Sequence, residues 1–136
     1  MVAHDLEQRV RIRARGLCEY CQLPQATYRL PFQIDHIIAR QHGGKTQLGN
    51  LALACPRCNR NKGPNLVGID TQTREIAKLY HPRRDRWADH FRWHGPRLRG
   101  LTPTDRATIR VLAINDSLAI ALRRELILEG VFSPRT

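Results

Sequence analysis

Aromatic residues and long apolar runs are both scarce in this sequence of 136 residues. Only 6 % of the residues are aromatic, so the core has to be mainly aliphatic. No apolar stretch approaches the ~18 residues that a membrane-spanning helix requires. The opening MVAHDLEQRV also lacks the apolar segment of a signal peptide. We therefore expect no membrane partner, a cytoplasmic location and one compact domain, 1–136.

Acidic residues and lysines are also in short supply. Twelve Asp and Glu face 23 Lys and Arg, which gives a formal net charge of +11, and only three residues are lysines. This excess attracts polyanions, and arginine can grip phosphate with two parallel hydrogen bonds. We expect a nucleic-acid partner, DNA in the first instance. Charge alone predicts binding and says nothing about catalysis.

The four cysteines form two Cys-x-x-Cys pairs with 33 residues between them. Each pair supplies two thiolates from one tight turn, and two such pairs complete the tetrahedral ligand set of a structural zinc ion. The alternative interpretation is two redox pairs or reduced structural cysteines. The predicted zinc ligands are Cys18, Cys21, Cys55 and Cys58.

Apolar spacing and helix-breaking residues predict alternating elements in the first half of the chain. A helix is expected over 5–15, extended chain over 28–38, a short strand in NLALAC (50–55) and a helix over 56–62. The second half is less explicit. It predicts a hairpin or loop at 70–78, a short helix or irregular segment at 83–93, and a helix from Thr102 or Thr104 towards Asn115. A last helix is expected at 117–129, with Leu118, Ala121, Leu122, Leu126 and Ile127 on one face.

Residues suited to phosphodiester chemistry lie between and beside the cysteine pairs. The carboxylate of Asp35 can hold a hard cation, and the neighbouring His36 can take up a proton near neutral pH. On a regular strand these two side chains point to opposite faces. Asn59 directly follows the second cysteine pair, and its amide oxygen can supply a second metal ligand. Zinc would then hold the strand and the helix in place, and a different ion would be the catalytic one.

The pattern CEYC … DHI … HGG … NLALAC … CNRNKG resembles an HNH endonuclease of the zinc-clamped type. The resemblance implies an α+β fold with a ββα-metal (His-Me finger) core at 18–63. A C-terminal extension, 64–136, is expected to be mainly helical and part of the same nuclease domain. The implied activity is metal-dependent hydrolysis of phosphodiester bonds in DNA, with a 5′ phosphate and a 3′ hydroxyl as products.

The same resemblance implies a role for each matching residue. His36 corresponds to the general base, Asp35 to the adjacent metal ligand, and Asn50 to the residue that ties the loop and orients the base. Asn59 stands where many members carry the last histidine, which makes this an HNN variant of the motif. An amide oxygen favours hard cations, so Mg²⁺ or Mn²⁺ is the expected catalytic ion, beside the structural Zn²⁺.

Basic side chains on the loop and the short helix are candidate phosphate contacts, with a merely solvated basic face as the alternative for each. They are Arg40, Lys45, Arg57, Arg60 and Lys62. The main alternative function is a non-catalytic, zinc-stabilised nucleic-acid-binding module, and a zinc-dependent protein-interaction module is a second one. A binder needs no metal-poised histidine, which favours the enzyme.

Two further pairs invite functional interpretations that we do not favour. His90 and His94 are four residues apart, but the glutamate of a metalloprotease motif is missing between them. We predict that this pair is structural. Trp87 and Trp93 are expected to anchor the core rather than to stack on nucleic-acid bases.

Overall fold

The computed structural model describes residues 2–134, which divide into two compact units. The first unit runs to Asn65 and also takes in His81–Arg84, and the second comprises Leu66–Tyr80 and the chain from Asp85 onwards. The single domain predicted for 1–136 stays a prediction. Within residues 2–134, no helix has both the length and the apolar character needed to cross a bilayer.

The first unit begins with helix α1, His4–Ala14. It buries Val10 and Ala14 and ends where Arg15 enters the left-handed region, at φ 56°. The expected helix over 5–15 is confirmed to within one residue at each end. Arg13 fixes α1 to the rest of the unit, because its guanidinium donates to the carbonyl oxygens of Leu48 and Leu51 at 2.9 and 2.6 Å.

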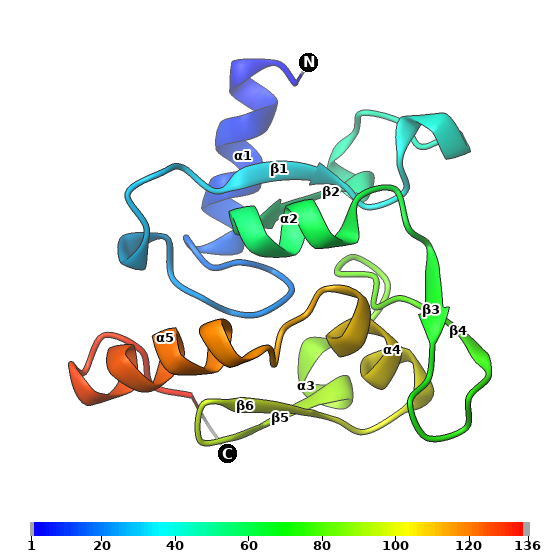
Figure 1. Cartoon of the computed structure of the whole chain (residues 1–136). Helices are drawn as coiled ribbons and strands as arrows, with labels where there is room; N and C mark the ends of the chain where they lie inside the picture. The colour runs from blue at the N-terminus through cyan, green and yellow to red at the C-terminus, as the bar shows by residue number, and fades with distance from the viewer. Residues whose placement is uncertain (1, 135–136) are drawn as a thin grey trace. The chain divides into compact units, whose positions relative to one another are not determined.

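The centre of this unit is a two-stranded antiparallel sheet covered by a short helix (Figure 1). Strand β1, Gln33–His36, pairs with β2, Leu51–Ala54, and His36 lies opposite Leu51. Helix α2, Pro56–Lys62, follows β2 directly and contacts both strands. Proline at its first position and Gly63 after its end bound α2 where the sequence predicted.

The connections within the first unit contain short 3-10 turns. These are η1 (Gln25–Thr27), η2 (Arg40–His42) and η3 (Leu48–Asn50). The expected extended stretch over 28–38 is therefore only partly a strand. Its N-terminal part pairs with a side chain instead of a neighbouring strand, because the Phe32 amide donates to Gln25 Oε1 at 2.6 Å.

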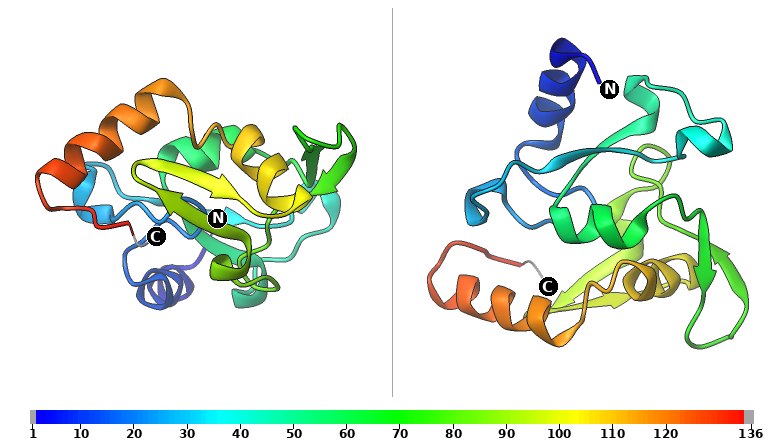
Figure 2. Two further views of the ribbon diagram at one scale, coloured as in Figure 1. Left: turned by 90° about the horizontal axis from the view of Figure 1, so that it is seen from below. Right: turned by 45° about the horizontal axis from the view of Figure 1, so that its top comes forward.

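Up to residue 134, the last that the structure describes, the second unit contains two hairpins and three helices. Strands β3 (Val67–Ile69) and β4 (Ile76–Lys78) form the first hairpin, so the hairpin alternative for 70–78 is confirmed, with strands that begin earlier. Helix α3 (Trp87–His90) leads into the second hairpin, β5 (Phe91–His94) with β6 (Arg97–Gly100). Figure 2 (left) shows β5 and β6 side by side.

The extension is thus a mixture of helices and hairpins, which differs from the mainly helical extension that we expected. Residues 91–99 alternate buried apolar with exposed polar side chains on each strand, the two-residue period of a sheet. Gly95, at φ 60°, makes the turn between them. A helix through 83–93 would scatter these apolar residues around its surface.

Helices α4 (Pro103–Val111) and α5 (Ser117–Leu128) complete the unit. Thr102, one of the two expected caps, forms a capping box with Asp105 at the start of α4, and α4 ends four residues before Asn115. The predicted start of α5 is confirmed and its predicted end is off by one residue. The predicted inner face of α5 is only partly right, because Leu126 is buried as expected, whereas Leu118 is 74 % exposed and Arg123 is buried instead. Trp93 is buried, as expected of a core anchor, while Trp87 is half-buried.

Candidate active site

The four cysteines come together in the first unit as a single buried cluster. Their sulfur atoms all lie within 4.8 Å of one another, and Cys21 Sγ is 3.8 Å from Cys55 Sγ. Tetrahedral zinc with Zn–S bonds of ~2.3 Å separates its sulfurs by about 3.8 Å. In each pair the amide of the second cysteine points at the sulfur of the first, at 3.5 Å for Cys18 and 3.4 Å for Cys55. The cluster is therefore positioned to bind zinc.

The chemistry of this cluster also favours a bound cation. Hydrogen bonds among the sulfurs, above all with Cys18, raise the pKa of Cys21 and of Cys58. Four buried thiolates in contact repel one another unless a cation compensates them, and a divalent metal does so by direct coordination. The first turn is also fixed to β2, because Glu19 and Leu53 exchange two hydrogen bonds of 2.8 Å.

Asp35 lies in the middle of β1 and is 6 % exposed. Its carboxylate accepts a 2.7 Å hydrogen bond from the hydroxyl of Tyr20, which sits between the first two cysteines. It also forms an ion pair with the ammonium of Lys62, with Nζ 3.1 Å from Oδ2 and 3.3 Å from Oδ1. Burial raises the pKa of Asp35, and the Lys62 charge and the Tyr20 hydroxyl oppose that rise.

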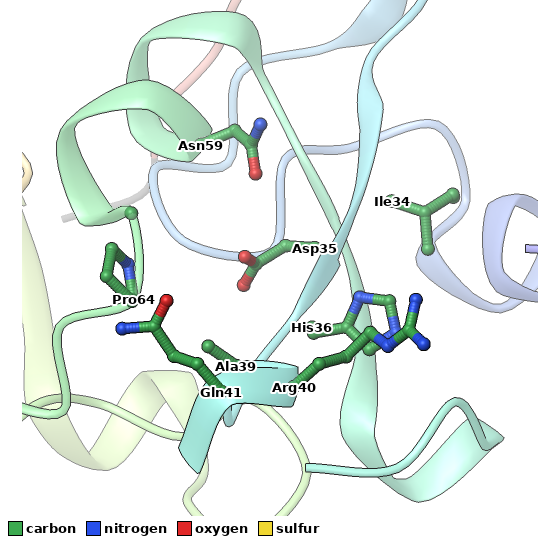
Figure 3. A pocket seen from close by; sticks show the side chains of 9 residues that line it. Ile34, Asp35, His36, Ala39, Arg40, Gln41, Asn59 and Pro64 are labelled. Atoms are coloured by element: carbon green, nitrogen blue, oxygen red, sulfur yellow. The ribbon is translucent and has the colours of Figure 1, made fainter. Parts of the chain in front are cut away.

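Asn59 faces Asp35 from helix α2. Its side-chain amide donates to Gln33 Oε1 on β1, and this bond leaves the other end of the amide free to turn inward. In Figure 3 the oxygen of Asn59 points towards the carboxylate of Asp35. Both residues line an open hollow of about 370 Å³, whose wall also includes His36, Arg40 and neighbouring loop residues.

His36 closes β1 and points away from the Asp35 side of the strand, beside Arg40 (Figure 3). Its Nε2 lies 2.8 Å from the hydroxyl of Thr46, and among residues 2–134 its Nδ1 has no hydrogen-bond partner. Burial lowers the pKa of His36 below the ordinary value, and the positive charge of Arg40 lowers it further, against the opposing effect of Asp35. The lowered pKa favours the neutral ring at pH 7.

Asn50 holds the loop that joins β1 to β2. Its side chain accepts from the Ile38 amide and donates to the carbonyl oxygens of Ile38 and Lys45, each at 2.9 Å. Gly44 passes so close to this contact that a Cβ atom there would lie 1.7 Å from the Ile38 oxygen. The loop is thus tied across its base directly after His36.

The predicted phosphate contacts fall into two groups. Arg40, Lys45 and Arg60 are exposed and Arg57 is half-buried, so these side chains are placed where a ligand can reach them. Lys62 is different, and the prediction of a phosphate contact for it has to be corrected. It is 2 % exposed, and its ammonium contacts Asp35 and the carbonyl oxygens of His36 and Gly63. Helix periodicity turns this residue towards β1 instead of the solvent.

Sequence reasoning missed three partners of the predicted site residues. They are Tyr20 on Asp35, Gln33 on Asn59 and Thr46 on His36. Gln33 carries the one local signal, since it is two residues before Asp35 and a strand points residues i and i+2 to the same face. The other two contacts join residues 10 and 15 positions apart, and no motif marks them.

A family model described as HNH endonuclease matches residues 18–65. The matched segment contains both cysteine pairs and all of Asp35, His36, Asn50 and Asn59. The HNH match supports a nuclease or nucleic-acid-binding role and nucleic acid, DNA foremost, as the partner. No curated protein and no solved structure matches the chain.

Proposed function

We propose that this protein is a metal-dependent endonuclease that hydrolyses phosphodiester bonds of DNA. The observation that carries the proposal is the hollow beside β1. It gathers a carboxylate, a neutral histidine and an amide, from Asp35, His36 and Asn59, within the segment that matches the HNH model. These are the residue types that hold a hard cation and accept a proton from water. The arrangement supports the proposal of a ββα-metal core of the HNN kind.

The proposed catalytic cation binds between Asp35 and Asn59. A carboxylate oxygen and an amide oxygen form a hard donor set, which suits Mg²⁺ or Mn²⁺ better than Zn²⁺. The hydrogen bond from Asn59 to Gln33 supports this assignment, because it fixes which end of the amide faces Asp35. When bound, such a cation stabilises the negative charge that develops on the phosphate group. It would share Asp35 with the Lys62 ammonium.

The remaining steps fall to side chains of the chain itself. His36 accepts the proton of the attacking water through Nδ1 while Nε2 donates to Thr46. The water oxygen bonds to phosphorus as the bond to the 3′ oxygen breaks, and the leaving 3′ oxygen takes a proton from solvent, which leaves a 5′ phosphate and a 3′ hydroxyl. Asn50 keeps the loop after His36 in place, and Arg40 is positioned to contact the phosphate.

The zinc site acts as a scaffold in this proposal. Cys55 directly precedes α2 and Cys58 lies within it. The other two ligands, Cys18 and Cys21, flank Tyr20, whose hydroxyl donates a hydrogen bond to Asp35. Zinc would thereby fix strand and helix in one register and set the distance between Asp35 and Asn59. Its loss is expected to disorganise the site even though zinc touches no substrate.

One observation favours the alternative of a non-catalytic, zinc-stabilised nucleic-acid-binding module. Asp35 is already paired with Lys62 and hydrogen-bonded to Tyr20. A carboxylate satisfied in this way has less charge left for a divalent ion. The two functions differ in one measurable respect, which is whether the protein cuts the nucleic acid that it binds.

Nicking of supercoiled plasmid distinguishes the two functions. The parent protein, His36→Ala and the exposed control His4→Ala are compared with Mg²⁺, with Mn²⁺, with Zn²⁺ and without added metal, after the zinc content of each has been matched. We expect the parent and the control to nick in Mg²⁺ or Mn²⁺, and His36→Ala to be slower by roughly 10²- to 10⁴-fold. Binding without nicking in every metal would replace the nuclease by the binding module. Best activity with Zn²⁺ would refute the role given to Asn59.

A further inference from the structure

The outer face of the β5–β6 hairpin in the second unit is entirely basic or neutral. Arg92 and His94 on β5 and Arg97 and Arg99 on β6 all point outward and are exposed. None of the four is used by the proposed active site. We refer to these four side chains as the basic ribbon.

The strand register brings basic side chains together on this face, among them two arginines. Arg92 lies directly opposite Arg99, and His94 lies directly opposite Arg97. Like charges at opposed positions destabilise a sheet. No carboxylate relieves the repulsion, because in the part of the chain that the structure describes none of the three arginines forms an ion pair. Such an arrangement is unfavourable for folding alone and suits an anionic ligand.

Of the three arginines, the two on β6 have the most N–H groups that make no hydrogen bond within residues 2–134. The guanidinium of Arg92 donates to the carbonyl oxygens of Phe91 and Ala88. Those of Arg97 and Arg99 donate to no atom of residues 2–134. Arg97 also lines an open hollow of about 450 Å³ that Arg110 enters from α4. The basic surface therefore continues from the hairpin on to the neighbouring helix of the same unit.

Acidic groups near this hollow are already engaged. Asp70 is paired with Arg106 through hydrogen bonds of 2.7 and 3.1 Å. Asp116, which lines the hollow, caps α5 by accepting from the Ala119 amide at 2.8 Å. Asp70 is thus neutralised by Arg106, and the one further carboxylate that lines the hollow, Asp116, lies among Arg97, Arg106 and Arg110.

Side chains of the same unit also hold the backbone of the hairpin. Asn115 bonds both backbone groups of Leu98, accepting at 2.9 Å and donating at 2.6 Å, as a third strand would. The buried guanidinium of Arg123 donates to the Pro96 carbonyl in the turn at 2.7 Å. A ligand that binds the ribbon therefore has little conformational entropy to remove from its backbone.

We propose that the basic ribbon is a second nucleic-acid contact, in which Arg97 and Arg99 bind backbone phosphates of the DNA. The inference rests on the proposed function, since it assigns to the second unit a share in binding the same substrate. A rigid two-stranded ribbon fits the major groove of a duplex, and arginine forks match phosphate oxygens. Contacts of this kind position DNA without selecting a sequence.

The test measures DNA binding as a function of salt in the full chain. All proteins carry His36→Ala so that the duplex stays intact, and binding of a fluorescent 20-base-pair duplex is followed by anisotropy from 0.05 to 0.3 M salt. Arg97→Gln/Arg99→Gln is compared with a control that removes the same charge from exposed sites elsewhere in the unit, Arg74→Gln/Arg124→Gln. Because the two variants have the same net charge, a difference in their DNA binding reports a local contact and not a general attraction between protein and DNA.

Each phosphate contact adds ~0.9 to the slope of log K against log salt. Loss of two contacts therefore lowers the slope by roughly 1.8 and weakens binding about 60-fold at 0.1 M salt. The control is expected to change binding less than about fivefold. Arg97→Lys/Arg99→Lys, which keeps the charges, should retain the salt slope. The glutamine variant should melt no lower than the parent, because the repulsion across the hairpin is gone.

Each result has a definite meaning. Equal weakening in the ribbon variant and the control, or no weakening in either, overturns the ribbon contact. If the lysine variant also lowers the slope of log K against log salt, then the positive charges at positions 97 and 99 are not what binds the DNA. If the parent binds but never nicks plasmid, the proposed function fails and the ribbon contact stands. A parent that binds no nucleic acid refutes both.

Discussion

Replacing Asn50 by alanine tests the loop that follows His36. The substitution removes three side-chain hydrogen bonds of 2.9 Å, two to the backbone of Ile38 and one to Lys45. The backbone bond from Ile37 to the Asn50 carbonyl, also 2.9 Å, is retained. The strand pairing of β1 with β2 should therefore survive while the base of the loop loosens.

The expected cost follows from the number of bonds and their surroundings. A hydrogen bond of this kind contributes about 0.5–1.5 kcal/mol net, so three contribute roughly 1.5–4.5 kcal/mol. Asn50 is 6 % exposed, so alanine leaves polar backbone groups facing a site that water enters poorly. The loosened loop carries Thr46, the partner of His36, and cleavage should fall with it.

Two measurements follow the substitution. Chemical denaturation gives the free energy of unfolding, and hydrogen exchange reports the Ile38 amide, which Asn50 protects. The matched control is Asn65→Ala, an exposed asparagine of the same unit. Zinc content is determined for both variants, so that an effect on the metal site is recognised. The Ile38 amide should exchange faster in Asn50→Ala alone.

A small effect of Asn50→Ala on stability and on hydrogen exchange would refute the role given to Asn50. If Asn50→Ala changes the free energy of unfolding by less than about 0.5 kcal/mol and leaves Ile38 protected, these hydrogen bonds do not hold the loop. If the loop loosens and cleavage is unchanged, then Asn50 supports the fold but does not position His36.

Four other predictions follow from single contacts. Gly44→Ala places a Cβ 1.7 Å from the Ile38 oxygen, so both the melting temperature and the nicking rate should fall. Tyr20→Phe removes a hydrogen bond to the buried carboxylate of Asp35; it should cost about 1.5–3 kcal/mol and raise the Mn²⁺ concentration needed for nicking. Chelation of zinc should unfold the first unit, because four buried thiolates lose their cation. The circular dichroism signal that the first unit contributes should then be lost. Hydrogen bonds from its arginine partner hold the pKa of Asp70 well below the ordinary value, so Asp70→Asn should melt lower at pH 7, with a difference that shrinks as the pH falls below about 4.

Each of these has a control in the same chain. Gly49→Ala has no atom within 4 Å of the added Cβ and should behave as the parent. Tyr28→Phe alters a half-buried tyrosine that Asp35 does not contact, and Asp89→Asn alters an exposed carboxylate. Re-addition of zinc should restore the first unit. Equal effects in variant and control would show that the named contact is not the cause.

The pattern of residue types was sufficient to predict the elements with strong local signals. Proline at the start of α2 and glycine after its end bound that helix in the sequence as in the structure. The two cysteine pairs predicted the metal cluster, because each pair forms its own turn and needs only one partner pair. Two threonines, Thr102 and Thr104, were candidate caps for the next helix, and the structure uses Thr102.

Elements with weaker local signals were predicted less well. The segment 83–93 was assigned to a short helix or an irregular region, although Phe91–His94 is a strand of a hairpin. A strand of four residues is stable only through its partner, and the partner lies beyond a turn. The inner face of α5 was also misplaced in part, since buried Arg123 is polar and bonds the carbonyl oxygens of Pro96 and Ile114.

The sequence by itself therefore determined which residues can carry chemistry, and the tertiary structure decided what each of them contacts. Adjacent positions such as Asp35 and His36 were visible as a pair, but the side chains that hold Asp35 come from residues 15 and 27 positions away. Lys62 became a buried partner instead of a phosphate contact for this reason. Local patterns record backbone preferences and spacing, whereas contacts between distant side chains depend on how strands and helices pack, which no local pattern encodes.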